Sequence, residues 1–271
     1  MACVRRRVLI ACTAALMSLS AAVAAEEARL ALVIGNGAYK EGALKNPVND
    51  SRAVAAALRS LGFEVIEREN TTLRDLVTAL QDFSIRARNA QVRMLYYAGH
   101  GMQVKGRNYL IPVDASLATE DEVPRKSADV NDLLDRLAEL RSGMNLIVLD
   151  ACRNNPFNNL PTLTADGRRI RNRALGDSGG LALVEAPRGT LVAFSTAPGT
   201  VAIDSSSQGH SVYTKHLLAN ITTSGQPVEL LFKRVRIAVA GETHNLQIPW
   251  EASSLVGDFC FKLGAGKRCG T

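Results

Sequence analysis

Apolar runs alternate with helical patterns along most of the chain, and this alternation limits the fold more than any other feature of the sequence. Short continuous apolar runs, typical of buried strands, occupy residues 30–34, 63–66, 92–98, 146–149 and 190–195, and a last short strand is expected at 259–261. Apolar residues at helical spacing occupy 49–61, 72–83, 127–140, 211–220 and 227–240. Thr72 and Ser127 stand where two of these helices would be capped. The alternation predicts a single three-layer α/β domain, with a mostly parallel sheet and helices on both faces.

The first 25 residues predict an export signal that is not part of this fold. Arg5–Arg7 form a basic start, an apolar run extends over Val8–Ala25, and Glu26 and Glu27 follow the small residues at its end. This is the pattern of a cleavable signal peptide, so residues 26–271 are expected to form a periplasmic or secreted domain. The run is also long enough for an uncleaved membrane anchor, and only that alternative predicts a membrane partner.

The net charge is weak evidence for a nucleic-acid partner once its location is considered. The full chain carries a formal charge of +6, but three of its arginines lie in the expected signal peptide, which contains no acid. The mature chain would therefore carry +3. Four further arginines crowd into one irregular stretch, residues 153–186: Arg168, Arg169, Arg171 and Arg173. Irregular stretches of this length inside a domain are usually functional or mobile. We expect no nucleic-acid partner.

Two reactive side chains follow strands that are consecutive in the core of the expected sheet. His100 comes after the run 92–98, and Cys152 comes after the run 146–149. Ligands of parallel sheets bind beyond the carboxyl ends of the strands, and such strands are often neighbours, so the two side chains are expected in one crevice. An imidazole that takes the thiol proton activates a cysteine as nucleophile, while the backbone N–H groups of Gly101 and Cys152 could hold an oxyanion. The pattern predicts a His–Cys catalytic pair.

The residues around this pair resemble those of the caspase-fold cysteine peptidases. The segments that carry the resemblance are Leu95–Gly101 and Val148–Arg153, followed by Asn49-Asp50, Gly209–Thr214 and Gln247–Trp250, which resemble the bacterial, metacaspase-like members. The resemblance covers roughly residues 28–262. It implies a cysteine-type endopeptidase that acts on polypeptides, with His100 as general base and Cys152 as nucleophile.

The resemblance also implies which residue precedes the cleaved bond. Metacaspases cut after Arg or Lys and hold that P1 side chain with two acids, which fall on Asp50 and Asp150 in this sequence. A carboxylate two residues from the nucleophile would pair with a guanidinium and repel an acidic side chain. The stretch 153–186 lies where caspase-fold enzymes carry their processing linker, so its four arginines are candidates for self-cleavage. An ordinary solvated basic loop is the equal alternative.

The remaining cysteines suggest a bridge. Cys260 and Cys269 could form a disulfide in an oxidising compartment, and two unrelated thiols are the alternative. If these two pair, Cys152 is left as the free thiol that a nucleophile requires.

No cofactor is required by the sequence, and no metal site is expected. His210, His216 and His244 lack the spacing of a helical metal pair. Metacaspases often respond to calcium through clustered acids, so the resemblance makes calcium a candidate. The acidic loop residues here form no recognisable calcium loop: Asp114, Glu120, Asp121 and Glu122.

Three other interpretations compete with the cysteine peptidase. Gly176–Gly180 copies the nucleophile signature of chymotrypsin-like serine proteases, with Ser178 as nucleophile, but that family is built from two β-barrels. Gly35–Gly37 resembles the start of a dinucleotide loop, but Lys40 stands where the third glycine is needed. The third alternative is a catalytically weak caspase-like domain that binds or regulates without cutting.

Overall fold

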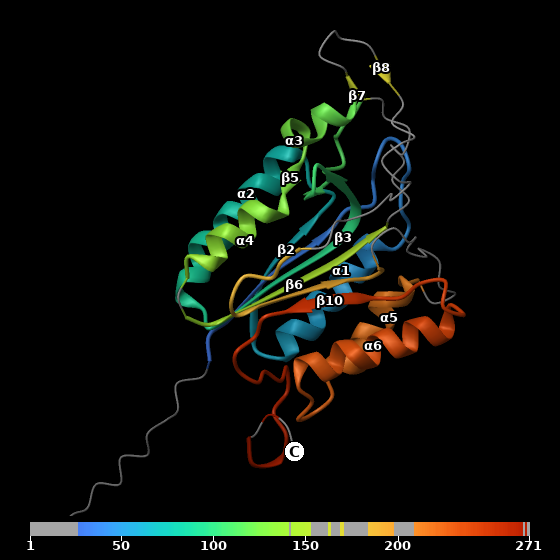
Figure 1. The fold of residues 1–271 in the computed structure, drawn as a ribbon. Coiled ribbons are helices and arrows are strands. Elements are labelled where there is room, and N and C mark those ends of the chain that lie inside the picture. The colour runs from blue at the N-terminus through green and yellow to red at the C-terminus, as the bar shows by residue number, and fades with distance from the viewer. Residues whose placement is uncertain are drawn as a thin grey trace, which may run out of the picture.

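The central element of the molecule is a twisted sheet of the predicted type. The computed structural model describes residues 27–140, 142–152, 162–163, 169–170, 184–197, 209–267 and 269. The main strands, in spatial order, are β2 (Phe63–Glu69), β1 (Arg29–Gly35), β3 (Val92–Val104), β6 (Met144–Cys152), β9 (Thr190–Phe194) and β10 (Trp250–Ser253) (Figure 1). The first five are parallel, and β10 runs antiparallel to β9 at the edge.

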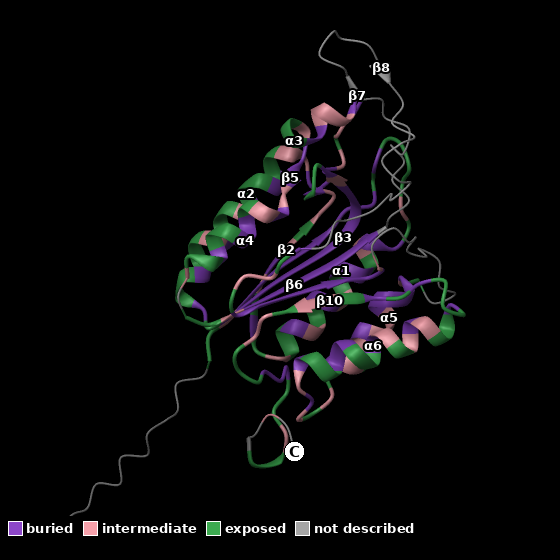
Figure 2. Cartoon of the chain, viewed as in Figure 1, coloured by how far each residue is buried: buried purple, intermediate pink, exposed green. Residues whose placement is uncertain are grey.

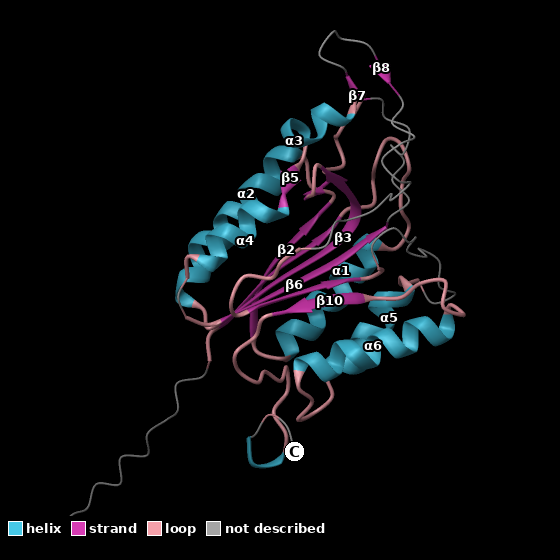
Figure 3. Cartoon of the chain, in the orientation of Figure 1, coloured by secondary structure: helices cyan, strands magenta, loops and turns pink. Residues whose placement is uncertain are grey.

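Two layers of helices cover the sheet, one on each face (Figures 1 and 3). One layer consists of α1 (Pro47–Ser60), α5 (Val212–Ile221) and α6 (Val228–Glu242), and the opposite layer of α2 (Leu73–Arg86) and α4 (Val130–Ala138). Alternate residues of β1 serve the two layers: Ala31 and Val33 pack on the first side, Leu30 and Leu32 on the second. Figure 2 shows the central strands buried along their length. The predicted three-layer α/β domain is confirmed.

Short elements surround this core. The hairpin strand β4 (Arg107–Leu110) pairs with the end of β3, and β5 (Ala128–Asp129) pairs with β4. The helix α3 (Val123–Lys126) precedes β5, and 3₁₀ turns occupy Ala87–Asn89, Glu120–Glu122 and Ala265–Lys267. The strands β7 (Thr162–Leu163) and β8 (Arg169–Ile170) pair with each other alone. No helix within the part of the chain described here is long and apolar enough to cross a membrane.

One predicted helix cap is correct and the other is wrong. The hydroxyl of Thr72 accepts from the N–H of Asp75 and begins α2 as expected. Helix α4 is capped by Asp129, whose carboxylate accepts from the N–H of Asn131, and not by Ser127. The hydroxyl of Ser127 donates instead to the carbonyl of Val123, because α3 ends just before it.

One predicted strand is longer than expected, and another does not form. The third strand does not stop at Ala98 but continues to Val104, because the hairpin with β4 pairs its extra residues. His100 therefore lies within a strand. The expected strand 259–261 is wrong, because β10 already occupies the sheet edge next to β9. Phe259 and Phe261 are buried against the first helical layer instead.

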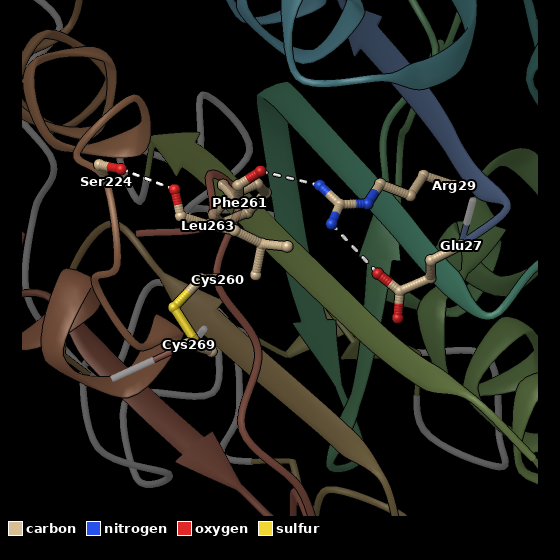
Figure 4. The surroundings of a disulfide bond; sticks show 7 residues. All are labelled: Glu27, Arg29, Ser224, Cys260, Phe261, Leu263 and Cys269. Atoms are coloured by element: carbon tan, nitrogen blue, oxygen red, sulfur yellow. Dashed lines mark hydrogen bonds and ion pairs between the residues drawn. A yellow bond between two sulfur atoms is a disulfide. The ribbon is translucent and has the colours of Figure 1, made fainter. Parts of the chain in front are cut away.

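Cys260 and Cys269 are joined by a disulfide in this segment (Figure 4). The segment is held to the start of β1, where the guanidinium of Arg29 donates to the carbonyl of Phe261 at 2.8 Å and lies over the ring of Phe259. The disulfide thus secures the C-terminal segment at the end of the sheet where the parallel strands begin.

Candidate active site

The two residues predicted to act together are direct neighbours in the sheet. His100 on β3 and Cys152, the last residue of β6, are partners in the parallel register. Backbones of adjacent strands lie about 4.8 Å apart, so a histidine and a cysteine are brought side by side at the carboxyl ends of two central strands. This is the edge of the sheet at which parallel α/β folds bind their ligands.

The imidazole of His100 is held in one orientation by a carbonyl group. Its Nε2 lies 2.6 Å from the carbonyl oxygen of Gly42, in the loop between β1 and α1. A carbonyl only accepts, so Nε2 carries the hydrogen and the lone pair of the neutral ring is on Nδ1. His100 is 3% exposed, and Nδ1 has no hydrogen-bond partner within the residues described. The atom left to accept a proton is therefore Nδ1.

Burial also sets the protonation state of this ring. Loss of solvent lowers the pKa of His100 below its ordinary 6.5, and the hydrogen bond to Gly42 opposes that shift in part. The neutral imidazole, which is the form that can act as a base, is thereby favoured at neutral pH.

The N–H of Gly101 points toward the side of β3 on which Cys152 lies. The N–H of Ile111 donates to the carbonyl of His100 at 3.1 Å, which makes Gly101 and Leu110 a non-hydrogen-bonded pair of the β3–β4 hairpin. Ile111 is bonded to Asn36, directly after β1, so β4 lies on the β1 side. The Gly101 N–H is consequently directed to the β6 side, as an oxyanion donor requires.

The two predicted pocket acids share one buried polar cluster. Asp50 of α1 and Asp150 of β6 are 1% and 6% exposed. The carboxylate of Asp50 accepts from the N–H of Ser211 at 3.2 Å and lies 2.7 Å from Nδ1 of His210. Asp150 accepts from the hydroxyls of Ser211 and Thr214, the latter at 2.7 Å. The structure thus brings together acids that are 100 residues apart in the sequence.

This cluster lies at the start of α5, where the partial charge of the helix end complements the charges of Asp50 and Asp150. Ser211 is the N-cap of α5, and its hydroxyl also accepts from the N–H of Thr214. The N-terminus of a helix carries a partial positive charge, which is complementary to the negative charge of nearby carboxylates. The two acids act on a neighbouring phenol in turn: burial and then the charges of Asp150 and Asp50 raise the pKa of Tyr96 well above 10.

Several residues of the site were not identified from the sequence. Gly42 acts through a backbone carbonyl, which has no signature in a sequence. Ser211 and Thr214 belong to the segment Gly209–Thr214 that carries part of the family resemblance, but nothing in it indicated that the segment holds the acids. His210 lacks the spacing of a helical metal pair, and nothing in the sequence indicates that it bonds Asp50.

The other predicted sites are placed only in part. The side chains of the four arginines of the candidate self-cleavage stretch lie outside what is described, as does the segment 176–180 with Ser178; Arg169 is placed only by its backbone in β8. His216 is paired with Glu242. Of the acidic loop residues that form no recognisable calcium loop, Asp114 accepts from the N–H of Leu73 and Glu122 is paired with Lys126. No group of three metal-binding side chains occurs within the described ranges.

Comparison with known proteins agrees with this geometry. The family model of the caspase domain matches residues 28–260, nearly the whole region that forms the sheet and its helices. A curated relative, the human mucosa-associated lymphoid tissue lymphoma translocation protein 1, is 32% identical over 140 residues, which is 51% of this chain and 17% of that protein. Its mouse homolog is likewise 32% identical over 140 residues, 51% of this chain and 16% of the relative.

The aligned region is thus a small part of these curated relatives, about one sixth of their length. The family model carries the assignment, because it spans both His100 and Cys152 and the strands that place them side by side. The chain belongs to the caspase domain family of cysteine peptidases.

Proposed function

We propose that this protein is an active cysteine endopeptidase in which His100 and Cys152 form the catalytic dyad. The observation that carries the proposal is the pairing of these two residues in register, with Nδ1 of a neutral His100 left to take a proton. In the first step the thiol proton of Cys152 moves to Nδ1, and the sulfur forms a bond to the carbonyl carbon of the substrate. The N–H groups of Gly101 and Cys152 stabilise the resulting oxyanion.

The intermediate then collapses. The carbon–nitrogen bond breaks, Nδ1 of His100 gives its proton to the leaving amine, and a thioester on Cys152 remains. Water then attacks the thioester carbon while His100 accepts the proton that the water loses. The carbon–sulfur bond breaks, the acid product leaves, and His100 returns the proton to the sulfur of Cys152.

We also propose that the P1 side chain is Arg or Lys. Two carboxylates that share one buried cluster, one of them two residues before Cys152, support this preference. A guanidinium can bridge two carboxylates, and an aspartate brought to the same place would be repelled.

Export and self-processing complete the proposal. Residues 1–25 would direct the protein to the periplasm or outside the cell, where the Cys260–Cys269 disulfide is stable. The enzyme would cut its own chain after one or more of the four arginines in residues 153–186, namely Arg168, Arg169, Arg171 and Arg173. Calcium is a candidate activator of this self-cleavage.

The alternative is a caspase-like domain that binds peptides with little or no cleavage. One observation favours it: both acids of the cluster already accept hydrogen bonds from the first residues of α5. In that case the acids would serve the fold, and the pocket would have no net preference for a basic side chain.

Hydrolysis of fluorogenic peptide amides by the mature protein tests the proposal. We expect cleavage after Arg and Lys and none after Asp, and loss of activity in Cys152→Ala but not in Ser178→Ala. Equal rates in the wild type and Cys152→Ala would refute the dyad. Activity lost only in Ser178→Ala would point to the serine protease.

A second variant pair tests the P1 pocket. Asp150→Asn keeps the shape of the side chain and removes its charge, so KM for an Arg substrate should rise by about tenfold or more. Asp258→Asn, at an exposed acid, is the matched control and should leave KM unchanged. An unchanged KM in Asp150→Asn would support the binding domain or another P1 preference.

A further inference from the structure

The loop between β1 and α1 approaches His100 at more than one point. Besides Gly42, it contributes Tyr39, whose phenol oxygen accepts from the backbone N–H of His100 at 2.9 Å. The rings of Tyr39 and His100 are also in contact, with centroids 4.3 Å apart at a tilt of 47°. A single side chain therefore touches both the backbone and the imidazole of this residue.

The tyrosine is itself fixed. Tyr39 is 6% exposed, and its hydroxyl donates to the carbonyl of Ile111 at 3.1 Å. A second buried phenol, Tyr97, lies 3.2 Å from it and donates to the carbonyl of His100 at 2.7 Å. The N–H and the carbonyl of His100 are thus both held by phenol groups.

Gly99 makes this arrangement possible. A Cβ atom at Gly99 would lie 2.6 Å from the phenol oxygen of Tyr39 and 2.8 Å from that of Tyr97, closer than any real contact. The backbone of Gly99 has φ +156°, a value that residues with a side chain rarely adopt. The glycine before His100 therefore leaves the space through which the two phenols reach the backbone.

The hydroxyl of Tyr97 is suited to a structural role at neutral pH. Burial raises the pKa of Tyr97 well above 10, so its hydroxyl stays protonated and keeps donating throughout the physiological range. No step of the proposed reaction uses either hydroxyl.

We infer that Tyr39 is a positioning residue for His100. It fixes the backbone of His100 through the N–H and limits rotation of the imidazole through ring contact, while Gly42 in the same loop fixes Nε2. Together these contacts hold the imidazole in one orientation, with Nε2 on the carbonyl of Gly42 and Nδ1 left to accept a proton. A base misplaced by a fraction of an ångström loses rate without losing substrate affinity. The inference rests on the proposed role of His100.

The test compares Tyr39→Phe, which keeps the ring and removes the hydroxyl, with Tyr109→Phe. Tyr109 is a buried tyrosine of the same apolar cluster, but its ionisable neighbours are Asp129 and Arg107. We expect Tyr39→Phe to lower kcat by about tenfold with KM within about twofold of wild type, and Tyr109→Phe to leave both unchanged. A kcat in Tyr39→Phe equal to that of the wild type would overturn the inference.

A second readout does not depend on turnover. The imidazole nitrogen and carbon resonances of His100, assigned with a His100→Asn variant, are followed through a pH titration by NMR in protein carrying Cys152→Ala. Tyr39→Phe should shift the pKa of His100 and mix its two tautomers, with the thermal midpoint close to that of Tyr109→Phe. If Tyr39→Phe leaves the titration of His100 unaltered, the positioning role is rejected, even if the wild type cleaves no peptide. If the titration is altered but the wild type is inactive, only the proposed function is rejected.

Discussion

At the scale of single residues, the site depends on atoms that are buried and already oriented. His100 is the clearest case, because one ring nitrogen is fixed by Gly42 and the other is withheld from solvent and has no described partner. A ring that is already held in one orientation needs no rotation before it accepts a proton. Its environment therefore determines the pH range in which it can act as a base.

The lowered pKa of His100 predicts the acid limb of the activity profile. The active form is neutral, and burial keeps the ring neutral to lower pH, so kcat/KM should fall with a midpoint below 6.5. Steady-state rates on an Arg substrate between pH 4 and 8 provide the measurement. His216→Gln, at a histidine paired with Glu242, is the control and should leave this limb in place. A wild-type midpoint at or above 6.5 would contradict the assignment of His100 as the base.

At the scale of elements, α1 and the end of β1 are in unusually close contact. A Cβ atom on Gly35 would lie 2.3 Å from the hydroxyl oxygen of Ser51 and 2.4 Å from the carbonyl oxygen of Pro47. Since the latter is backbone of α1, neither rotation nor a small shift of a side chain relieves the clash. The helix that carries Asp50 is positioned by this contact.

Gly35→Ala should therefore destabilise the protein by about 1–3 kcal/mol, the usual cost of overpacking. Gly241→Ala is the matched control: Gly241 lies in α6, and a Cβ atom there meets nothing within 4 Å. The added methyl group should stabilise α6 by about 0.5 kcal/mol through helix propensity. Urea unfolding of the three proteins measures both effects, and equal changes in the two variants would mean that the contact with α1 is not tight.

The elements themselves were largely predictable from the sequence, and their tertiary contacts were not. Periodicity located the strands and helices because burial on one or two faces dictates where apolar residues recur. It also placed His100 and Cys152 at the same sheet edge. The prediction was wrong at 259–261, where Phe259 and Phe261 are buried against helices and do not pair with a neighbouring strand. It was also wrong at Ser127, whose hydroxyl bonds the carbonyl of Val123 in α3 and does not cap α4. Contacts such as Tyr39 with His100 join distant segments, and no local pattern encodes them.

At the scale of the whole molecule, the disulfide and the proposed dyad lie at opposite ends of the sheet. Cys260 neighbours Phe261, which is bonded to Arg29 at the start of β1, and Arg29 is in register with Val92 on β3. His100 lies eight residues further along that strand, roughly 26 Å away at 3.3 Å per residue. Stability at one end and chemistry at the other can therefore be varied separately.

Removal of the bridge should accordingly lower stability and leave the chemistry intact. The double variant Cys260→Ala and Cys269→Ala opens a short loop, with an expected cost of about 2–3 kcal/mol in unfolding free energy. Its kcat on an Arg substrate at 25 °C should equal that of the wild type. Calorimetry and initial rates provide the two measurements, and a stable but inactive variant would show that the tail takes part in the site.

The bonding of Asp50 and Asp150 to the start of α5 has a consequence for how this family can diversify. The residues that would recognise a substrate are also the ones that satisfy the first turn of a helix and anchor it against the sheet. Replacing Asp150 by an apolar residue would leave the hydroxyls of Ser211 and Thr214 without their acceptor. A variant that lost both carboxylates would have to rebuild the start of α5 as well, so the proposed preference for a basic P1 residue would be protected by folding as well as by selection for activity.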